Sequence, residues 1–368
     1  MRTVASPLRL VAVLGALALV LAACGGTADP SVDGDAGTDA TDTTEATETT
    51  EAPDTTEATE PEGPATDLTI VATTTILGDV LRNVVDGDAV VEVLMPIGAD
   101  PHDFQASSAQ VAAVNGADLV VANGLFLEEG LEDVLDAAAN DGANVFEVAP
   151  LLDPIPFGET SHGHGDDDHG HDHEDDDHGD EESKEDDHDH DHEGDDPHVW
   201  MDPVRMAEAA RLIATELAAI DDSVDWTANA EAYAAELEDL DGEIADLLAG
   251  IPDDDRKLVT NHESMGYFAD RYDFEMVGVV IPGGSTLGDP SSEELAGLVA
   301  TMQAEGVDVV FAETTDPSAL ADAVAAELGT DAQVVELFTG SLGEPGSGAE
   351  TYVDMMRTNA ELIAAALG

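Results

Sequence analysis

Three of the twelve histidines in the chain stand apart from the rest and could bind a metal ion. His102 lies in GADPHDFQ, His198 in DDPHVWMDP and His262 in TNHESMGYF, and each lies on a predicted connection after a strand. Two of them end the tripeptide Asp-Pro-His, in which proline restricts its own backbone and that of the preceding residue. Imidazole favours Zn, Cu, Ni or Fe over Mg or Ca. The pattern therefore predicts one metal site, and a four-coordinate zinc there would have one position left for a carboxylate or a water.

The other nine histidines are interleaved with Asp and Glu in a run that has almost no apolar residues. This composition predicts a disordered loop over residues 159–196, beside the site. Three interpretations are open, namely a solvated acidic insert, a metal-sensing loop and a set of weak zinc sites, and we favour the last. Weak binding is expected because the carboxylates also favour protonated imidazole and because ordering a flexible chain costs entropy. The nine residues are His162, His164, His169, His171, His173, His178, His188, His190 and His192.

Strands and helices alternate along most of the remaining chain. Leu68–Thr73 and Ala89–Met95 are predicted strands with a helix, Ile76–Val85, between them, and the same alternation resumes in the C-terminal part. The alternation predicts an α/β fold with parallel sheets in two lobes, residues 67–205 and 255–368.

A helical region is predicted to join the lobes. It covers residues 206–254 and includes one long amphipathic helix, Trp226–Leu248, while Asp202 and Pro203 are the expected N-cap and first residue of the preceding helix. Open α/β sheets bind ligands beyond the carboxyl ends of their strands, so two facing lobes would form a cleft that holds the metal. A single rigid linking helix predicts small motions between the lobes.

The N-terminus has the pattern of an export signal. Arg2 and Arg9 precede an apolar run over residues 10–22 that is shorter than a membrane-spanning helix, so residues 1–23 are a predicted signal peptide. The only cysteine, Cys24, follows in LAAC, which resembles a bacterial lipobox. This resemblance implies cleavage before Cys24, lipidation of its thiol and attachment to the outer side of the cell membrane.

The charge of the chain is extremely negative. Only 10 Lys and Arg oppose 83 Asp and Glu, which gives a net charge of −73. Such a field disfavours nucleic acid and anionic lipid as partners and favours cations. Residues 24–66 are almost entirely Thr, Glu, Asp, Ala, Gly and Pro, and they predict a disordered acidic tether.

Several motifs together point to a known family. GADPHDFQAS, ADLVVANGLFLEEGL, the His-rich insert, DPHVWMDP, NHESMGYFADRY, VVFAETT and SLGEPGSGAETYVDMMRTN follow one another in this order. Over residues 67–368 the chain resembles the zinc- and manganese-binding solute-binding lipoproteins of ABC transporters. The resemblance implies two α/β lobes joined by one rigid helix, with His102, His198 and His262 as the metal ligands. It also implies a monomeric receptor, not an enzyme, that captures a divalent metal ion outside the cytoplasm and delivers it to an ABC-type permease.

The resemblance favours zinc as the transported ion over manganese. Zinc-type members have histidine as the third ligand, which is His262 here, whereas manganese-type members tend to have a carboxylate. Many members also carry an aspartate ligand just before Ser-Leu in the last motif, where this chain has Gly340. Glu313 and Glu336 are possible substitutes as the fourth ligand, and a water is an equal alternative.

Three nearby residues have two interpretations each. Asp100 and Asp196, which begin the Asp-Pro-His tripeptides, could orient imidazoles or form turns. Trp200 could line the cleft or pack in the core. For the whole protein, a manganese or iron receptor, a surface adhesin and a zinc hydrolase are the alternative functions. No general-base motif in the sequence supports a hydrolase.

Overall fold

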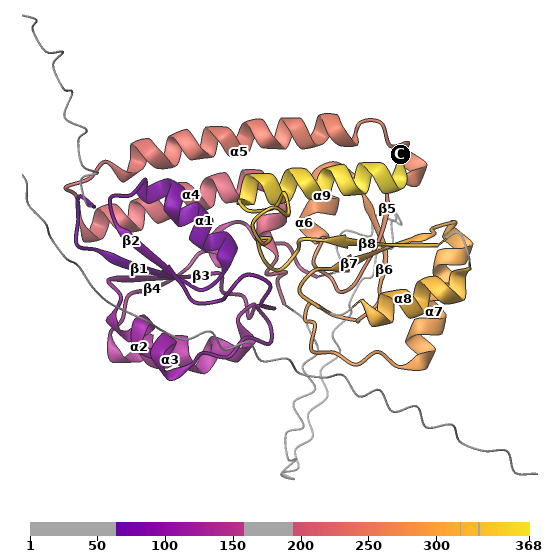
Figure 1. The fold of residues 1–368 in the computed structure, drawn as a ribbon, viewed down its shortest axis with the longest axis horizontal. Coiled ribbons are helices and arrows are strands. Elements are labelled where there is room, and N and C mark those ends of the chain that lie inside the picture. Colours follow the sequence, from indigo (N-terminus) through magenta and orange to yellow (C-terminus); the bar gives the residue numbers. More distant parts are fainter. Residues whose placement is uncertain (1–63, 158–193, 317, 330–331) are drawn as a thin grey trace, which may run out of the picture. The chain divides into compact units, whose positions relative to one another are not determined.

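The described residues contain two four-stranded parallel sheets with the same strand order (Figure 1). The computed structural model describes residues 64–157, 194–316, 318–329 and 332–368, all within one compact unit. The sheets have the orders β2-β1-β3-β4 and β6-β5-β7-β8. The strands are β1 (Thr69–Ala72), β2 (Val90–Val93), β3 (Leu119–Ala122), β4 (Val145–Glu147), β5 (Lys257–Thr260), β6 (Glu275–Val279), β7 (Val309–Glu313) and β8 (Gln333–Leu337). This confirms the predicted fold of two parallel-sheet α/β lobes.

Helices follow the strands in each lobe. We call the first sheet with α1–α3 the first lobe, and the second sheet with α6–α8 the second lobe. Their helices are α1 (Thr75–Val85), α2 (Ser108–Gly116), α3 (Glu132–Asp141), α6 (Gly266–Tyr272), α7 (Ser292–Glu305) and α8 (Ala319–Leu328). Polar side chains cap the N-termini of α2 and α7, where Ser107 and Ser291 form capping boxes with Gln110 and Glu294.

Three further helices lie along one side of both sheets (Figure 1). They are α4 (Pro203–Ile220), α5 (Trp226–Leu248) and α9 (Tyr352–Leu367). With 23 residues, α5 is about 34 Å long, and it packs against α1, α4 and α9. Asp202 caps α4 by accepting hydrogen bonds from the backbone of Val204 and Arg205, which confirms the predicted cap.

One hydrophobic core continues from the first lobe to the second beneath α5. It includes Ile70 of the first sheet, Leu237 and Ile244 of α5, and Phe268 and Met355 of the second half of the chain, all buried. Smaller clusters fill the opposite face of each sheet, under α2 and α3 in one lobe and under α7 and α8 in the other. Since the shared core contacts both sheets, the elements that position the histidines belong to one continuous packed unit.

The observed elements are close to those predicted from the sequence. The predicted bounds of Leu119–Ala122 and Trp226–Leu248 match β3 and α5, whereas β1 and β2 are shorter than predicted at both ends. The expected boundary after residue 205 falls inside α4. Residues 1–63 and 158–193, which carry the predicted signal peptide, most of the tether and most of the His-rich loop, lie outside the described residues. Among the helices of the described part, none has the length and apolar character required to cross a membrane.

Candidate metal centre

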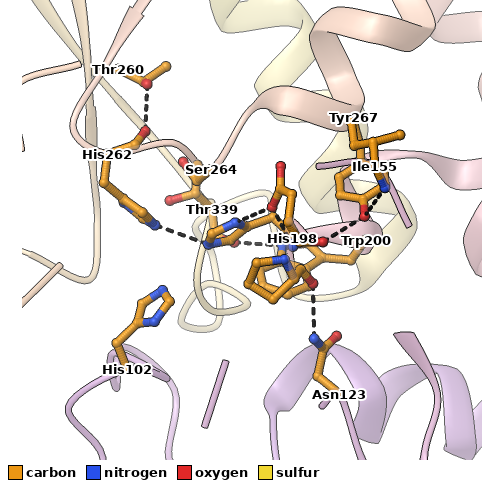
Figure 2. Close-up of polar contacts among 12 residues, drawn as sticks. His102, Asn123, Ile155, His198, Trp200, Thr260, His262, Ser264, Tyr267 and Thr339 are labelled. Atoms are coloured by element: carbon orange, nitrogen blue, oxygen red, sulfur yellow. Dashed lines mark hydrogen bonds and ion pairs between the residues drawn. The ribbon is translucent and has the colours of Figure 1, made fainter. Parts of the chain in front are cut away.

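His102, His198 and His262 lie together in the structure and are buried. One nitrogen from each ring can be chosen so that all three atoms lie within 4.8 Å of one another. The ring centroids are 4.9 to 5.5 Å apart, and the rings point toward one another in Figure 2. The Nε2 atoms of His198 and His262 are 3.0 Å apart. The arrangement offers three nitrogen donors to a single ion.

The three histidines come from connections that the two sheets bring to the same place. His102 lies on the loop between β2 and α2, and His262 lies two residues after the end of β5. His198 precedes a short 3₁₀ helix, η3 (Val199–Met201), which leads into α4. Carboxyl ends of parallel strands are where open α/β sheets place their ligands, and His102 and His262 follow such ends in different lobes.

Asp196 holds His198 at two points. Its Oδ1 atom accepts a hydrogen bond from the His198 backbone at 2.9 Å and lies 2.7 Å from His198 Nδ1. Its carbonyl oxygen accepts a hydrogen bond from the Tyr267 hydroxyl at 2.6 Å. Burial raises the pKa of Asp196 to about 7, against the opposing effects of the His198 N–H and of His262, His102 and Arg205. Burial also lowers the pKa of His198 well below its usual value, which favours the neutral imidazole that a metal requires.

Glu313 holds His262 from the outer side. Its Oε1 atom lies 2.5 Å from His262 Nδ1, while Ser264 Oγ donates to the same oxygen at 3.4 Å. Burial disfavours the charge on each partner, but their mutual attraction outweighs it, so that the pKa of Glu313 is lowered and that of His262 is raised. Glu313 thus contacts the nitrogen of His262 that faces away from His198.

His102 is held mainly by its backbone. Its N–H donates to Asp100 Oδ1 at 3.0 Å, while the nearest carboxylate to its ring is Glu129, with Oε1 3.5 Å from Nδ1. Within the described residues, neither ring nitrogen of His102 has a hydrogen-bond partner. Asp100 and Asp196 therefore differ, because only Asp196 contacts the imidazole of its own tripeptide.

The pocket around the three rings is small and has both polar and aromatic walls. Its lining is Asp100, Pro101, His102, His198, Trp200, His262, Glu313, Thr339 and Gly340. Trp200 is buried, its indole N–H donates to the Thr339 carbonyl at 2.7 Å, and its ring centroid is 5.2 Å from that of His198. Trp200 therefore both lines the pocket and packs in the core. Glu336 is exposed on β8 and is not among the lining residues.

Some residues that support the site have no distinct signal in the sequence. Asn123 donates from its side chain to the Pro197 carbonyl at 2.9 Å, beside His198, and Tyr267 hydrogen-bonds the backbone of Asp196 (Figure 2). Both act on main-chain atoms, so their residue types alone do not reveal the contact. Cys24 and the nine histidines of the run lie outside the described residues.

Comparisons with known proteins agree with this geometry. The family model described as "Zinc-uptake complex component A periplasmic", ZnuA, matches residues 70–366. The manganese-binding lipoprotein MntA of Halalkalibacterium halodurans is 30% identical over 82% of this chain and 88% of its own length. The zinc-binding protein TroA of Treponema pallidum is 27% identical over 81% of this chain and 88% of its own length.

Solved structures show the same architecture. The periplasmic zinc-binding protein TroA of Treponema pallidum superimposes with a TM-score of 0.66 at 27% identity, covering 82% of this chain and all of that chain. The family consists of substrate-binding receptors and not enzymes, which confirms that expectation from the sequence. With two parallel-sheet lobes, a buried cluster of histidines and a match over residues 70–366, the chain belongs to the ZnuA family of metal-binding receptors of ABC importers.

Proposed function

We propose that this protein captures zinc outside the cytoplasm and delivers it to an ABC-type import permease. The observation that carries the proposal is the convergence of three buried imidazoles, His102, His198 and His262, within 4.8 Å. Three imidazoles are a common protein ligand set for zinc, with a fourth position taken by another ligand. Zinc is the cargo here, so the site has to bind it tightly and also release it.

The carboxylates of Asp196 and Glu313 would decide which nitrogens bind the ion. A carboxylate beside Nδ1 accepts the proton of that nitrogen, which leaves the lone pair on Nε2. In His198 and His262 the two Nε2 atoms face each other at 3.0 Å. Two lone pairs at this distance repel unless a proton or a cation lies between them. A zinc ion would replace such a proton, and the nearby negative charge would offset part of the charge of the ion.

Zinc fits this set of donors better than manganese does. Imidazole nitrogen suits zinc, whereas manganese favours carboxylate, carbonyl and water oxygens. Glu313 is engaged with His262, and Gly340 has no side chain, so we infer that a water completes the coordination. A manganese receptor is the second candidate, because the relatives include both manganese-binding and zinc-binding proteins.

The other parts of the chain fit the same role. We propose that residues 1–23 direct export, that Cys24 carries the lipid anchor, and that residues 24–66 are the tether. The folded receptor would then be a monomer of two lobes, 67–205 and 255–368, joined through 206–254.

The His-rich run would add weak zinc sites beside the tight one. Removal of residues 162–192 is expected to lower the number of zinc ions bound in excess metal. The affinity of the tight site should stay within about tenfold, since none of its three histidines is removed. Loss of the tight site on this deletion would instead show that the run supplies one of its ligands.

Isothermal titration of the metal-free protein with zinc and with manganese tests the proposal. We expect zinc to bind more tightly, and His102→Ala, His198→Ala and His262→Ala each to weaken zinc binding by at least about 100-fold. His164→Ala is the matched control, because it removes an imidazole from the run and leaves the cluster intact. Tighter binding of manganese would favour the second candidate, and unchanged zinc affinity in all three cluster variants would refute the site.

A further inference from the structure

The three histidines of the cluster are not held in the same way. The rings of His198 and His262 each have a buried carboxylate within 2.7 Å of Nδ1. Both ring nitrogens of His102 lack a hydrogen-bond partner within the described residues, whereas for His262 only Nδ1 lacks one, and Nδ1 pairs with Glu313. The nearest carboxylate oxygen to the His102 ring is 3.5 Å away. The position of this imidazole therefore depends on how its backbone is held.

The backbone of the His102 loop is held by residues of the opposite lobe. Asp100 accepts the His102 N–H through Oδ1 at 3.0 Å, and its other oxygen, Oδ2, accepts the hydroxyl of Thr286 at 2.5 Å. Thr286 lies on the connection between β6 and α7 of the second lobe. A second contact is close by, where Gly98 N–H donates to Ser341 Oγ at 2.9 Å. One carboxylate thus connects the least supported histidine to the other lobe.

The Thr286 contact lies where the pocket meets solvent. Asp100 lines the pocket but is only partly buried, as is Thr286, and the next residue, Leu287, is 55% exposed. The contacts that hold His198 and His262, by comparison, are fully buried. The contacts that hold the His102 loop are only partly buried, and the one between Asp100 and Thr286 can therefore open with little disruption of the core.

We propose that Thr286 is a positioning residue that latches the His102 loop to the second lobe through Asp100 and so controls how fast the metal leaves. This inference rests on the proposed function. Metal release requires one ligand to move away first, and His102 is the ligand whose ring has the least support. While the latch is closed, His102 stays in place. When the Thr286 hydroxyl leaves Asp100, the loop loses a restraint and the ion loses a ligand.

Rapid-mixing measurements of zinc transfer from the full-length protein to a colorimetric chelator test the latch. Thr286→Val removes the hydroxyl at nearly the same volume, and we expect the zinc dissociation rate to rise by about tenfold or more, as for loss of a hydrogen bond to a charged group. The association rate should change much less, because the three histidines are unaltered. Thr286→Ser keeps the hydroxyl and should restore slow dissociation.

Two controls separate the latch from other effects. Ser285→Ala removes a neighbouring hydroxyl that accepts the Leu287 N–H at 3.2 Å within the same loop, and it should leave the dissociation rate unchanged. His262→Ala, measured in parallel, reports on the site itself. If Thr286→Val releases zinc at the wild-type rate while His262→Ala has lost tight binding, the latch is wrong and the site stands. If His262→Ala also matches the wild type, the assignment of His262 as a ligand is wrong, and the proposed function fails if His102→Ala and His198→Ala match it too.

Discussion

His198 and His262 face each other through their Nε2 atoms at 3.0 Å, and each ring has a buried carboxylate at its other nitrogen. The two rings come from segments 64 residues apart in the sequence. Asp196 contacts His198 from two residues away in the same tripeptide, whereas Glu313 contacts His262 from a distant strand, β7. The roles of the two carboxylates can therefore be tested by substitution, like those of the histidines.

Replacing either carboxylate by its amide should weaken zinc binding without removing a ligand. Asp196→Asn and Glu313→Gln keep the size of the side chain but lose the charge that fixes the Nδ1 proton. Each is expected to lower zinc affinity by about 10- to 100-fold, measured by competition with a chelator. Glu336→Gln, an exposed change on the neighbouring strand β8, is the control. Wild-type affinity in both amide variants would mean that the imidazoles are oriented by packing alone.

A carboxylate at position 340 should shift the metal preference toward manganese. Gly340 lines the pocket, and a Cβ atom there would lie 3.1 Å from Pro101 Cδ and from Thr315 Oγ1, so small local shifts are needed. Gly340→Asp adds an oxygen donor, which manganese favours more than zinc does. Gly340→Asn has the same shape without the charge. The expected result is a higher ratio of manganese to zinc affinity in the aspartate variant, and an equal ratio in the two variants would contradict it.

The buried carboxyl of Asp79 should make stability depend on pH away from the metal site. Its Oδ2 atom accepts the Tyr352 N–H at 2.9 Å, at the start of α9. Burial raises the pKa of Asp79 above its usual value, against the effects of this bond and of Arg82. The folded state therefore keeps this proton to higher pH than the unfolded state. The contribution of Asp79 to stability is full below about pH 4 and declines as the pH rises through the folded pKa.

Asp79→Asn should accordingly raise the free energy of unfolding at pH 7 and have little effect near pH 4. Urea unfolding of the metal-free protein between pH 4 and pH 8 gives this comparison. Glu243→Gln is a control that should lower the free energy of unfolding at pH 7, because the hydrogen bond from Arg357 lowers the pKa of Glu243. Its effect should be small, since exposed ion pairs contribute little. Destabilisation by Asp79→Asn at every pH would mean that the bond to α9 outweighs the cost of the buried charge.

High salt should stabilise the folded protein. Surface pairs such as Arg357 with Glu243 and Arg271 with Asp241 are weakened by salt, but acidic residues outnumber basic ones by 83 to 10. Screening of repulsion among the excess acids should therefore dominate. We expect the melting temperature to rise between about 0.1 M and 1 M potassium chloride, the range over which the screening length falls from about 10 to 3 Å. A fall in melting temperature would show that the ion pairs matter more than the repulsion.

The sequence predicts the lobes and the cluster well because both leave local signals. The apolar run Leu119–Ala122 and the amphipathic period of Trp226–Leu248 correspond to β3 and α5 without adjustment. His102 and His198 share a tripeptide, and His262 directly follows a strand pattern. These signals depend on neighbours in the chain, so the sequence alone is sufficient to find them.

The sequence left two roles open for Asp100 and Asp196, and it did not predict the contact of Glu313 with the ring of His262. Asp100 and Asp196 occupy the same place in identical tripeptides, yet Asp196 contacts an imidazole, whereas Asp100 contacts the backbone of His102 and Thr286 of the other lobe. The sequence pattern predicts that Glu313 ends a strand. Its contact with Nδ1 of His262 depends on the pairing of β5 with β7. A contact between two segments that are distant in the sequence leaves no pattern in either segment alone.

The hydrophobic core that continues beneath α5 has a consequence for how the chain gains and loses its structure. The two lobes repeat the same strand order, but Leu237 and Ile244 of α5 belong to a core that contains residues of both sheets. A lobe produced alone would expose this apolar stripe to water. We therefore expect a single cooperative unfolding transition, in which binding of a metal ion at the histidine cluster protects the entire folded body. Despite the internal repetition of the fold, we expect neither lobe to fold and bind metal on its own.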